Sequence, residues 1–331
     1  MTPSPLRRAA LALALAATFS PALAQSTTAA ATPGWPSKPV KLVVGFPGGS
    51  SPDLVARTLA EPLAKALGQP VIVENKVGAG GNIAADAVAK ATDDHTLGIM
   101  INGNLTIARL INPRINYDPL KDLTPISLIA TAPLALAAPA NAPGATAQEF
   151  FAAARASGDR WNYGTPGVGT VAHIGMELLK NKAGINLVHV PYPGNPQVIN
   201  AIIGGQIQLS LLPPAMAAAQ ARAGTLRVIG VTSSGRSTLV PEYPSLAEAG
   251  VKDFNLEIWN AVAAPRSLPQ PVAARLSALF SEIARSPEVR AKLFQQGWQV
   301  KGTTAEGLAN RIQTDTRALG AVITSQGIEA E

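Results

Sequence analysis

The sequence predicts an α/β fold of two domains with a ligand cleft between them. Its 331 residues suffice for one large or two medium domains. Short apolar, β-branched segments alternate with amphipathic segments of helical spacing, which is typical of parallel sheets covered by helices. The loops after several of these strands are rich in glycine and polar side chains, and α/β proteins bind their ligands at such strand ends.

The first 24 residues have the pattern of a secretory signal. Its parts are a basic start, an apolar run and a small-x-small cleavage motif: Arg7-Arg8, Ala9–Ala17 and Ala22-Leu23-Ala24. The run is too short for a membrane anchor, and the chain has no cysteine that could carry a lipid. We therefore expect export, cleavage after Ala24 and a loose mature N-terminus at residues 25–34.

Composition excludes several classes of site. The absence of cysteine excludes disulfides, thiolate metal sites and thiol nucleophiles. Loss of the signal lowers the formal net charge from +6 to +4, because the signal holds two arginines and no acidic residue. With few aromatic residues and no basic run, this charge does not indicate nucleic-acid binding.

The first part of the chain repeats the order strand, polar loop, helix. We expect strands at 40–46, 70–73 and 96–101. Ser51-Pro52-Asp53 has the hydroxyl, proline and acid of a helix start, and this helix should kink at Pro62 and end at Gly68. Two further expectations concern the loops: Asn82 as the cap of a helix over 83–91, and a loop at Asn102-Gly103-Asn104.

The second part repeats the same order between two crossing segments. The apolar segment 126–138, broken only by Pro133, should cross to the second domain, and 254–264 should cross back. Between them we expect helices at 146–156, 171–180, 196–203 and 215–223 and strands at 160–163, 187–190, 207–212 and 226–231. Helices at 270–285, 288–295 and 304–325 should pack on the first domain, which would then comprise 35–132 and 256–331, with 133–255 as the second domain.

The glycine-rich loops are candidate anion sites, because a loop before a helix start exposes unpaired N–H groups at the positive end of the helix. Their polar side chains are neutral: Ser50, Ser51, Asn82, Asn102, Asn104, Thr165 and Thr170. A phosphate or tricarboxylate site normally brings cationic side chains, so these loops favour one or two carboxylates, held directly or through water. Phe46, Tyr192 and Trp259 are candidate apolar walls, with core packing as the alternative. Ser51 and Thr170 are expected to donate directly to the ligand.

Other kinds of site find little support. Gly167, Gly169 and Ala172 match a dinucleotide fingerprint, but the next strand lacks the acidic residue that would bind a ribose. The three histidines, His95, His173 and His189, show no metal-ligand spacing, so we expect no metal and no cofactor. The sequence contains no Gly-x-Ser-x-Gly motif, and the glycine loops contain no pair of carboxylates. Neither of these two signals of an enzyme is therefore present. His173 is a candidate donor to a ligand carboxylate, with a structural hydrogen bond as the alternative.

Several stretches carry a resemblance to a known family. They are Trp35–Val44, Phe46–Asp53, Val73–Asn75, Gly78–Ile83, Tyr117–Asp122, Tyr163–Thr170 with His173, Gly204–Gln206, Ala223–Arg227 and Val231–Ser233. In this order, over essentially the whole mature chain, the sequence resembles the periplasmic solute receptors of tripartite tricarboxylate transporters, the Bug family of Gram-negative bacteria.

The resemblance implies a type II periplasmic-binding-protein fold with a central cleft and two crossing hinge strands. It further implies a periplasmic, non-enzymatic receptor that closes on a carboxylated solute and delivers it to a membrane permease. The implied ligand contacts are Phe46, Gly48, Gly49, Ser50, Ser51, Asp53, Gly80, Gly81, Asn82, Thr165, Gly169, Thr170 and His173, to which the loop and strand-end positions add Asn104 and Tyr192.

Two departures from the family narrow the ligand. Ser50 stands where many relatives have glycine, and Leu211-Leu212 replaces a pair that often contains an acid. Loss of that acid removes an acceptor for an ammonium group, so we expect a mono- or dicarboxylate, aliphatic or aromatic, rather than an amino acid. We expect a monomer. The alternatives are a receptor that signals to a membrane sensor and an exported enzyme acting on organic acids.

Overall fold

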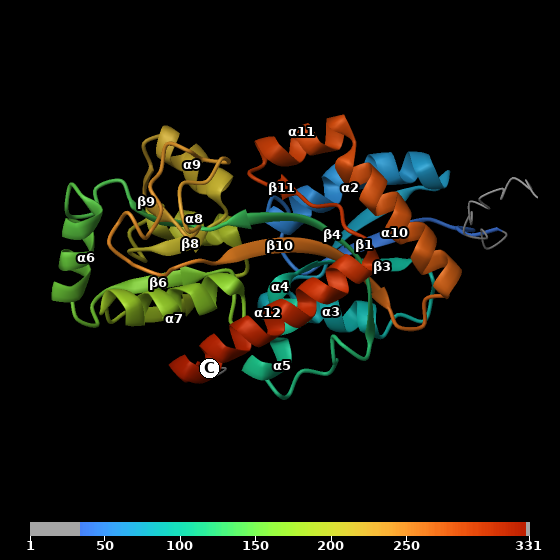
Figure 1. Ribbon diagram of the computed structural model, residues 1–331, viewed down its shortest axis with the longest axis horizontal. Helices are drawn as coiled ribbons and strands as arrows, with labels where there is room; N and C mark the ends of the chain where they lie inside the picture. Colours follow the sequence, from blue (N-terminus) through green and yellow to red (C-terminus); the bar gives the residue numbers. More distant parts are fainter. Residues whose placement is uncertain (1–33, 329–331) are drawn as a thin grey trace, which may run out of the picture. The chain divides into compact units, whose positions relative to one another are not determined.

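A computed structural model describes residues 34–328 (Figure 1). The expected signal, its cleavage site and nearly all of the expected loose segment at 25–34 lie outside the described residues. The described part contains a six-stranded sheet and two smaller sheets of three and two strands. We call the six-stranded sheet with its helices the first lobe, and the two smaller sheets with theirs the second lobe.

The first lobe is formed by both ends of the described chain. Its N-terminal elements are β1 (Val40–Val44), α2 (Ser51–Leu67), β2 (Val71–Asn75), the short 3-10 helix η1 (Ala79–Gly81), α3 (Asn82–Ala89), β3 (Thr96–Ile101), α4 (Asn102–Thr106), α5 (Ala108–Ile111) and β4 (Leu123–Pro133). Its C-terminal elements are β10 (Glu257–Pro265), α10 (Gln270–Arg285), α11 (Pro287–Gln295), β11 (Gln299–Val300) and α12 (Ala305–Gln326).

The second lobe comes from the middle of the chain. Its elements are β5 (Ala135–Pro139), α6 (Ala147–Ala156), β6 (Asn162–Thr165), α7 (Val171–Ala183), β7 (Val188–Pro191), α8 (Asn195–Ile203), β8 (Ser210–Leu212), α9 (Pro214–Arg222) and β9 (Leu226–Val231). A parallel bridge between Tyr163 and Leu209 joins its two sheets, so the strands lie in the order β7-β6-β8-β5-β9.

The two lobes have the same strand topology. In the first lobe the order is β2-β1-β3-β10-β4, with β11 added at the edge. β1 runs parallel to β2 and β3, and β10 lies antiparallel between β3 and β4. In the second lobe β6 runs parallel to β7, and β5 lies antiparallel between β8 and β9. The parallel strands therefore end at one edge of each sheet, as the sequence predicted.

Two crossing segments connect the lobes (Figure 1). β4 leads directly into β5, so one segment supplies an outer strand of the first lobe and the antiparallel strand of the second. The segment from β9 to β10 does the reverse on its return. The expected crossings at 126–138 and 254–264 are confirmed in place, although β10 begins only at Glu257.

Alternate residues of the central strands pack on opposite faces of each sheet. Val40, Leu42 and Val44 of β1 lie in the core under α2, α10 and α11, while Val43 lies in the core under α3 and the start of α12. In the second lobe Leu136 faces α6 and α7, and Ala137 faces α8 and α9. Each sheet is therefore covered on both faces, which explains why its strands read as continuous apolar runs.

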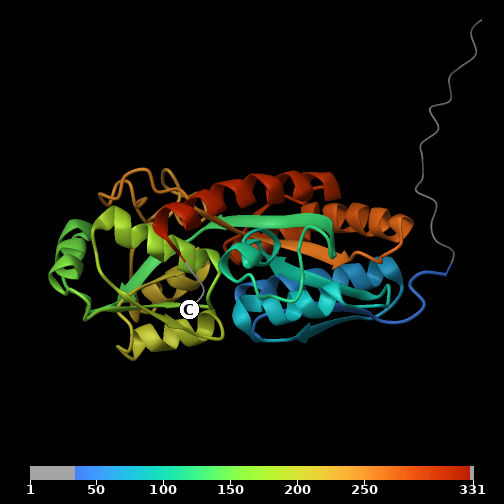
Figure 2. The same cartoon turned by 90° about the horizontal axis from the view of Figure 1, so that it is seen from below.

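The C-terminal helix α12 reaches beyond the first lobe. Its first half contributes Leu308 and Ile312 to the first-lobe core, whereas Leu319 and Ile323 pack in the second-lobe core with α7. Figure 2 shows α12 running alongside both lobes. With 22 residues the helix is about 33 Å long, longer than one lobe needs. The expectation that it packs on the first domain is therefore right for its first half only.

Three local expectations were wrong. Asn102–Thr106 is a short helix rather than a loop, because Asn104 Oδ1 accepts the Ile101 N–H at 3.3 Å and Thr106 Oγ1 donates to the Asn102 carbonyl at 2.7 Å. Asn82 does not cap α3, since its side chain points into a hydrogen-bond network described below. β1 ends at Val44 rather than at Phe46. α2 is continuous through Pro62 and ends, as expected, at Leu67 with Gly68 as its cap. Within residues 34–328 no helix has the length and apolarity of a membrane span.

Candidate functional site

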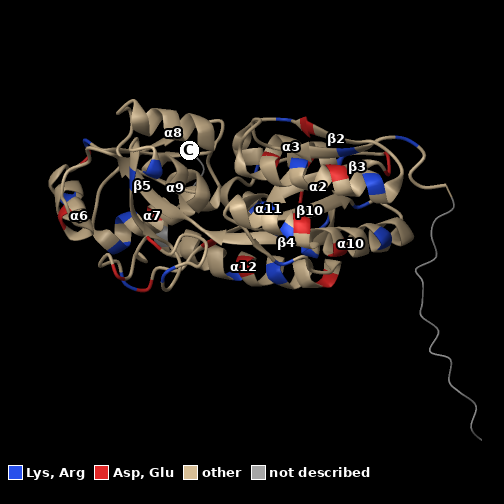
Figure 3. Ribbon diagram, turned by 90° about the horizontal axis from the view of Figure 1, so that it is seen from above, with Lys and Arg blue, Asp and Glu red and all other residues tan. Residues whose placement is uncertain are grey.

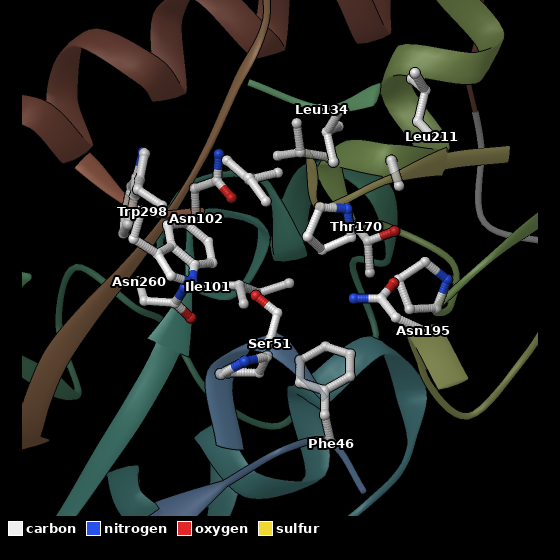
Figure 4. A pocket seen from close by; sticks show the side chains of 17 residues that line it. Phe46, Ser51, Ile101, Asn102, Leu134, Thr170, Asn195, Leu211, Asn260 and Trp298 are labelled. Atoms are coloured by element: carbon white, nitrogen blue, oxygen red, sulfur yellow. The ribbon is translucent and has the colours of Figure 1, made fainter. Parts of the chain in front are cut away.

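A cavity lies between the lobes, where the carboxyl ends of their parallel strands meet (Figure 4). Its volume is about 50 Å³, whereas one water needs about 10–15 Å³. The first lobe lines it with Phe46, Ser51, Pro52, Ile101, Asn102, Ile258, Trp259, Asn260 and Trp298. The rest of the lining is Leu134, Pro166, Thr170, Val171, Ala172, Asn195, Leu211 and Pro213. None of these side chains is charged; Lys, Arg, Asp and Glu are spread along outer helices such as α6, α10 and α12 (Figure 3).

Four helices of eight or more residues begin at this cavity. Ser51 starts α2, Val171 starts α7, Asn195 starts α8 and Pro213 precedes α9. Among the described residues, no hydrogen-bond partner is found for the N–H groups of Val171 and Ala172. Helix starts carry partial positive charge and free donors, so the cavity favours an anion although it contains no cationic side chain.

The first glycine loop, residues 45–51 from the end of β1 to the first residue of α2, is held in place by Asp53. Its Oδ2 accepts the Gly49 N–H at 2.9 Å and Arg57 Nε at 3.0 Å, and its Oδ1 accepts Arg57 Nη2 and Asn75 Nδ2. Burial alone would raise the pKa of Asp53, but the hydrogen bonds from Arg57, Asn75 and Gly49 outweigh it and lower the pKa below its usual value. This carboxylate therefore stays charged and fixes the loop to α2 and β2.

The second glycine loop, residues 76–81 between β2 and α3, is held by a network of hydrogen bonds around Asn104. Asn104 Nδ2 donates to the Gly80 carbonyl at 3.0 Å and to Asn82 Oδ1 at 2.9 Å. Tyr117 Oη donates within the same group, lying 2.8 Å from Asn82 Oδ1 and 2.9 Å from the Asn104 carbonyl. The two asparagines that the sequence assigned to the ligand are thus engaged with one another.

The third glycine loop, residues 166–170 between β6 and α7, is held by Thr165, Thr170 and two histidines. Thr170 Oγ1 donates to the Gly167 carbonyl at 2.8 Å and accepts the His173 N–H at 3.3 Å, so its only proton is already used within the loop. Thr165 Oγ1 lies 2.7 Å from His189 Nε2. The His189 ring stacks on that of His173 at 4.4 Å, and His173 Nδ1 accepts the Gly169 N–H at 3.4 Å.

These contacts divide the residues that the sequence assigned to the ligand. Three of them line the cavity: Phe46, Ser51 and Thr170. Gly80 and Tyr192 line a second, more open cavity of about 510 Å³ nearby, which shares Pro166 with the first. Asp53, Asn82, Asn104, Thr165 and His173 make the internal hydrogen bonds described above.

The remaining assigned residues are Ser50 and four glycines. The Ser50 side chain is fully buried, and Gly48 and Gly49 are exposed. Gly81 packs against Phe46 and Asn104, and the Gly169 carbonyl lies against Gly103.

Ser51 combines three features that no other hydroxyl of the glycine loops combines; the Oγ of Ser50 also lacks a partner in the described part of the chain, but Ser50 does not line the cavity. The Ser51 side chain is 4% exposed, it lines the cavity, and its Oγ has no hydrogen-bond partner among the described residues. A buried hydroxyl without a partner is costly, which indicates that a molecule in the cavity satisfies it. Ser51 is therefore the side chain of the first glycine loop best placed to donate to a ligand.

The sequence missed three polar or aromatic residues of the cavity: Asn195, the first residue of α8, Asn260 in β10, and Trp298, which precedes β11. Asn102, the first residue of α4, was named among the polar side chains of the loops but was not assigned to the ligand. A signal existed for Asn195, because Gly194-Asn195 follows β7 in the same strand, loop, helix order as the other loops. For Asn260 and Trp298 no such signal existed. Trp259 both lines the cavity and is fully buried, so the two interpretations of that residue are compatible.

Trp259 is fixed from behind by α12. Its Nε1 donates to Asp315 Oδ2 at 2.7 Å, Asp315 Oδ1 accepts Arg311 Nε at 2.8 Å, and Arg311 Nη2 donates to Glu257 Oε2 at 3.0 Å. This chain of bonds ties the floor of the cavity to the helix that spans both lobes. Among the described residues, no group of three or more His, Asp or Glu side chains could hold a metal.

The lobes touch one another around the cavity through glycines. A Cβ at Gly167 would lie 2.8 Å from Cα of Gly80, and one at Gly103 would lie 2.5 Å from the Gly169 carbonyl oxygen. A Cβ at Gly194 would lie 2.8 Å from two ring carbons of Pro47. Any side chain at these positions would push the lobes apart, so their glycines permit a closed arrangement.

Comparisons with known proteins agree with one another. Residues 55–328 match the sequence profile of the tripartite tricarboxylate transporter family receptor. BugT of Bordetella pertussis is 32% identical over 80% of this chain and 81% of its own length. The structure of MatC from Rhodopseudomonas palustris with bound malate is 31% identical, with a TM-score of 0.83 over 87% of this chain and 100% of that one. A protein of R. palustris with adipate is 29% identical, with a TM-score of 0.85 over 90% and 100%.

We predict that His173 makes the fold sensitive to mild acid. Burial is the largest cause that lowers the pKa of His173, to about 4, and the neighbouring His189 ring is the next. The nearby Glu177 raises this pKa but does not outweigh the two. Below pH 6.5 the unfolded chain takes up a proton that the fold refuses until about pH 4, so the free energy of unfolding falls as pH drops. Through His173, the free energy of unfolding should fall by about 2 kcal/mol between pH 7 and pH 5. Urea unfolding of the protein and of His173→Gln measures this, and equal pH slopes in the two would contradict it.

We also predict that Gly194→Ala weakens closure. Gly194 has φ −176°, which any residue adopts, so the substitution causes no local backbone strain. The added Cβ would clash with Pro47, while its 3.4 Å distance to Gln197 Oε1 is an ordinary contact. Ligand affinity should fall about tenfold, with a larger radius of gyration in X-ray scattering. The matched control is Gly235→Ala, where a Cβ meets open space. Identical affinity and scattering for both variants would show that the contact does not matter.

Proposed function

We propose, because the chain belongs to the tripartite tricarboxylate transporter receptor family, that it captures a small organic carboxylate between its lobes and delivers it to a membrane permease. The members of this family are periplasmic binding proteins that bind small carboxylates and work with such a permease. The ligand is a mono- or dicarboxylate, aliphatic or aromatic. The protein acts as a receptor, without a cofactor and without chemical change of the ligand.

One observation carries the proposal: helix starts from both lobes converge on a cavity without charged side chains. A carboxylate gains hydrogen bonds and favourable charge from such helix starts. A phosphate or a tricarboxylate would bring more negative charge than neutral donors normally balance, and the lining offers no arginine or lysine. The site therefore suits one carboxylate, or two at opposite helix starts.

The cavity also argues against an ammonium group on the ligand. Leu211 of β8 lines it where an acidic neighbour would be needed, and no Asp or Glu belongs to the lining. A buried ammonium without a partner charge is strongly unfavourable. Malate and adipate, the ligands of two similar structures, lack an amino group as well.

Binding involves a hinge motion of two domains, 35–132 with 256–331 and 133–255. The cavity lies between the lobes, so we infer that the lobes separate to admit the ligand and close over it. The crossing segments from β4 to β5 and into β10 are the natural hinges, since in the described part of the chain they lead from the strands of one lobe to those of the other. Closure removes the carboxylate from water and places it against both sets of helix starts.

The chain reaches its site of action through export. The N-terminal signal is cleaved after Ala24, and the mature receptor works as a monomer in the periplasm. An enzyme acting on organic acids is less well supported, because the lining contains no Asp, Glu, His or Lys that could act as an acid or base. Action through a membrane sensor would use the same site.

A ligand screen tests the proposal directly. The mature protein should show a raised melting temperature with at least one organic acid from a panel of aliphatic and aromatic mono- and dicarboxylates, confirmed by calorimetry. Amino acids and inorganic phosphate serve as controls and should give no shift. Tight binding of aspartate or glutamate, or turnover of a bound acid, would contradict the proposed function.

Ser51→Ala should weaken binding of the identified acid. Loss of one hydrogen bond to a charged group costs about 1–3 kcal/mol, so the dissociation constant should rise about five- to a hundredfold. The melting temperature without ligand should hardly change, because the Ser51 hydroxyl has no partner in the protein. Ser267→Ala, at an exposed serine far along the chain, is the control. Equal dissociation constants for both variants would remove Ser51 from the site.

A further inference from the structure

Two buried amides in the first-lobe wall of the cavity are not explained by carboxylate binding. Asn102 and Asn260 are each 1% exposed, and both line the cavity beside Trp298 (Figure 4). They are neighbours by strand register, because Asn260 of β10 pairs with Ile101 of β3, the residue before Asn102. Their positions are therefore fixed by the sheet rather than by a mobile loop.

The amide oxygens of both residues lack partners. Asn102 Nδ2 donates to the Glu257 carbonyl at 3.0 Å, which settles the orientation of this amide and turns its Oδ1 away from that carbonyl. Neither Asn102 Oδ1 nor Asn260 Oδ1 has a hydrogen-bond partner in the described part of the chain. Buried amide oxygens are rarely left unpaired in folded proteins, so this wall is built to receive a donor.

The donor is not the carboxylate. A carboxylate has only acceptor oxygens and would be repelled by the amide oxygen of Asn102. Nor is it an ammonium group, because no acidic side chain belongs to the lining. A neutral hydroxyl fits both conditions. It donates its one proton to Asn102 Oδ1, and its oxygen accepts from Asn260 Nδ2 when that amide turns its nitrogen toward the hydroxyl; no hydrogen bond to Asn260 Oδ1 opposes this turn in the described part of the chain.

We propose that the ligand is a hydroxycarboxylate, whose hydroxyl group binds between Asn102 and Asn260 while its carboxylate binds at the helix starts. This inference rests on the proposed function and assigns the second polar contact of the same ligand. The carbon skeleton lies against the apolar surfaces of Trp259, Trp298 and Ile258. Because the two asparagines lie on one wall only, one enantiomer of a chiral hydroxy acid binds better than the other.

The test uses pairs of acids that differ only in the hydroxyl. Calorimetry compares malate with succinate, 3-hydroxybutyrate with butyrate, and mandelate with phenylacetate, taking the better enantiomer of each hydroxy acid. In pairs that bind, the hydroxy acid should bind about ten- to a hundredfold more tightly, because an acid without the hydroxyl leaves Asn102 Oδ1 without a donor. If both members bind equally, a water satisfies the asparagines and the inference fails while the proposed function stands. If no carboxylate of the panel binds, both fail.

Two variants separate the ends of the ligand. Asn260→Leu removes the amide at a similar side-chain volume, so it should abolish most of the preference for the hydroxy acid over its partner without a hydroxyl. Ser51→Ala should weaken both members by a similar factor and preserve the preference. A second wall variant, Asn102→Leu, guards against loss of fold, checked by the cooperativity of thermal unfolding. A full preference in both folded asparagine variants would overturn the inference.

Discussion

The constraint on which this structure depends is the need to satisfy N–H groups at helix starts that face a closed space. Four helices from two lobes begin at one cavity. Pro52, Pro196 and Pro214, at the first or second position of three of them, remove some of the donors without removing the helix charge. Among the described residues, no Asp or Glu side chain lines that cavity. The positive ends therefore remain available to an anion from outside, which is the physical basis of the proposed carboxylate binding.

The rigidity of the glycine loops follows from the same constraint. Backbone donors discriminate among ligands only if their positions are fixed, and glycine-rich chain is flexible by itself. Asp53 ties the first loop to α2 and β2, and Asn104 ties the second loop to α4. Thr165 and Thr170 brace the third. The polar side chains thus hold the backbone that would meet the ligand, and only a few of them, Ser51 among these, face the cavity themselves.

The mirrored topology explains how a single chain builds such a site twice. Each lobe directs the carboxyl ends of its parallel strands, and the helices that follow, toward the other lobe. Each also receives its antiparallel strand from the segment that crosses between them. Glycines at Gly80, Gly103, Gly167 and Gly194 let the loops touch, so the cavity is enclosed without side chains filling it. The wall formed by Asn102 and Asn260 adds two amide oxygens that have no hydrogen-bond partner in the described part of the chain.

The sequence by itself determined the order of strands and helices, the crossing segments, the neutral character of the loops and the family, because periodicity, glycine and proline act locally and are visible in single stretches. It placed Phe46, Ser51 and Thr170 at the cavity for the same reason. Only the tertiary structure decided that the side chains of Asp53, Asn82, Asn104 and Thr165 hold the loops, that α12 spans both lobes, and that Asn260 and Trp298 reach the cavity. Those outcomes depend on which distant residues share a hydrogen bond or a sheet register, and residues such as Ile101 and Asn260 meet only after the chain has crossed to the second lobe and returned.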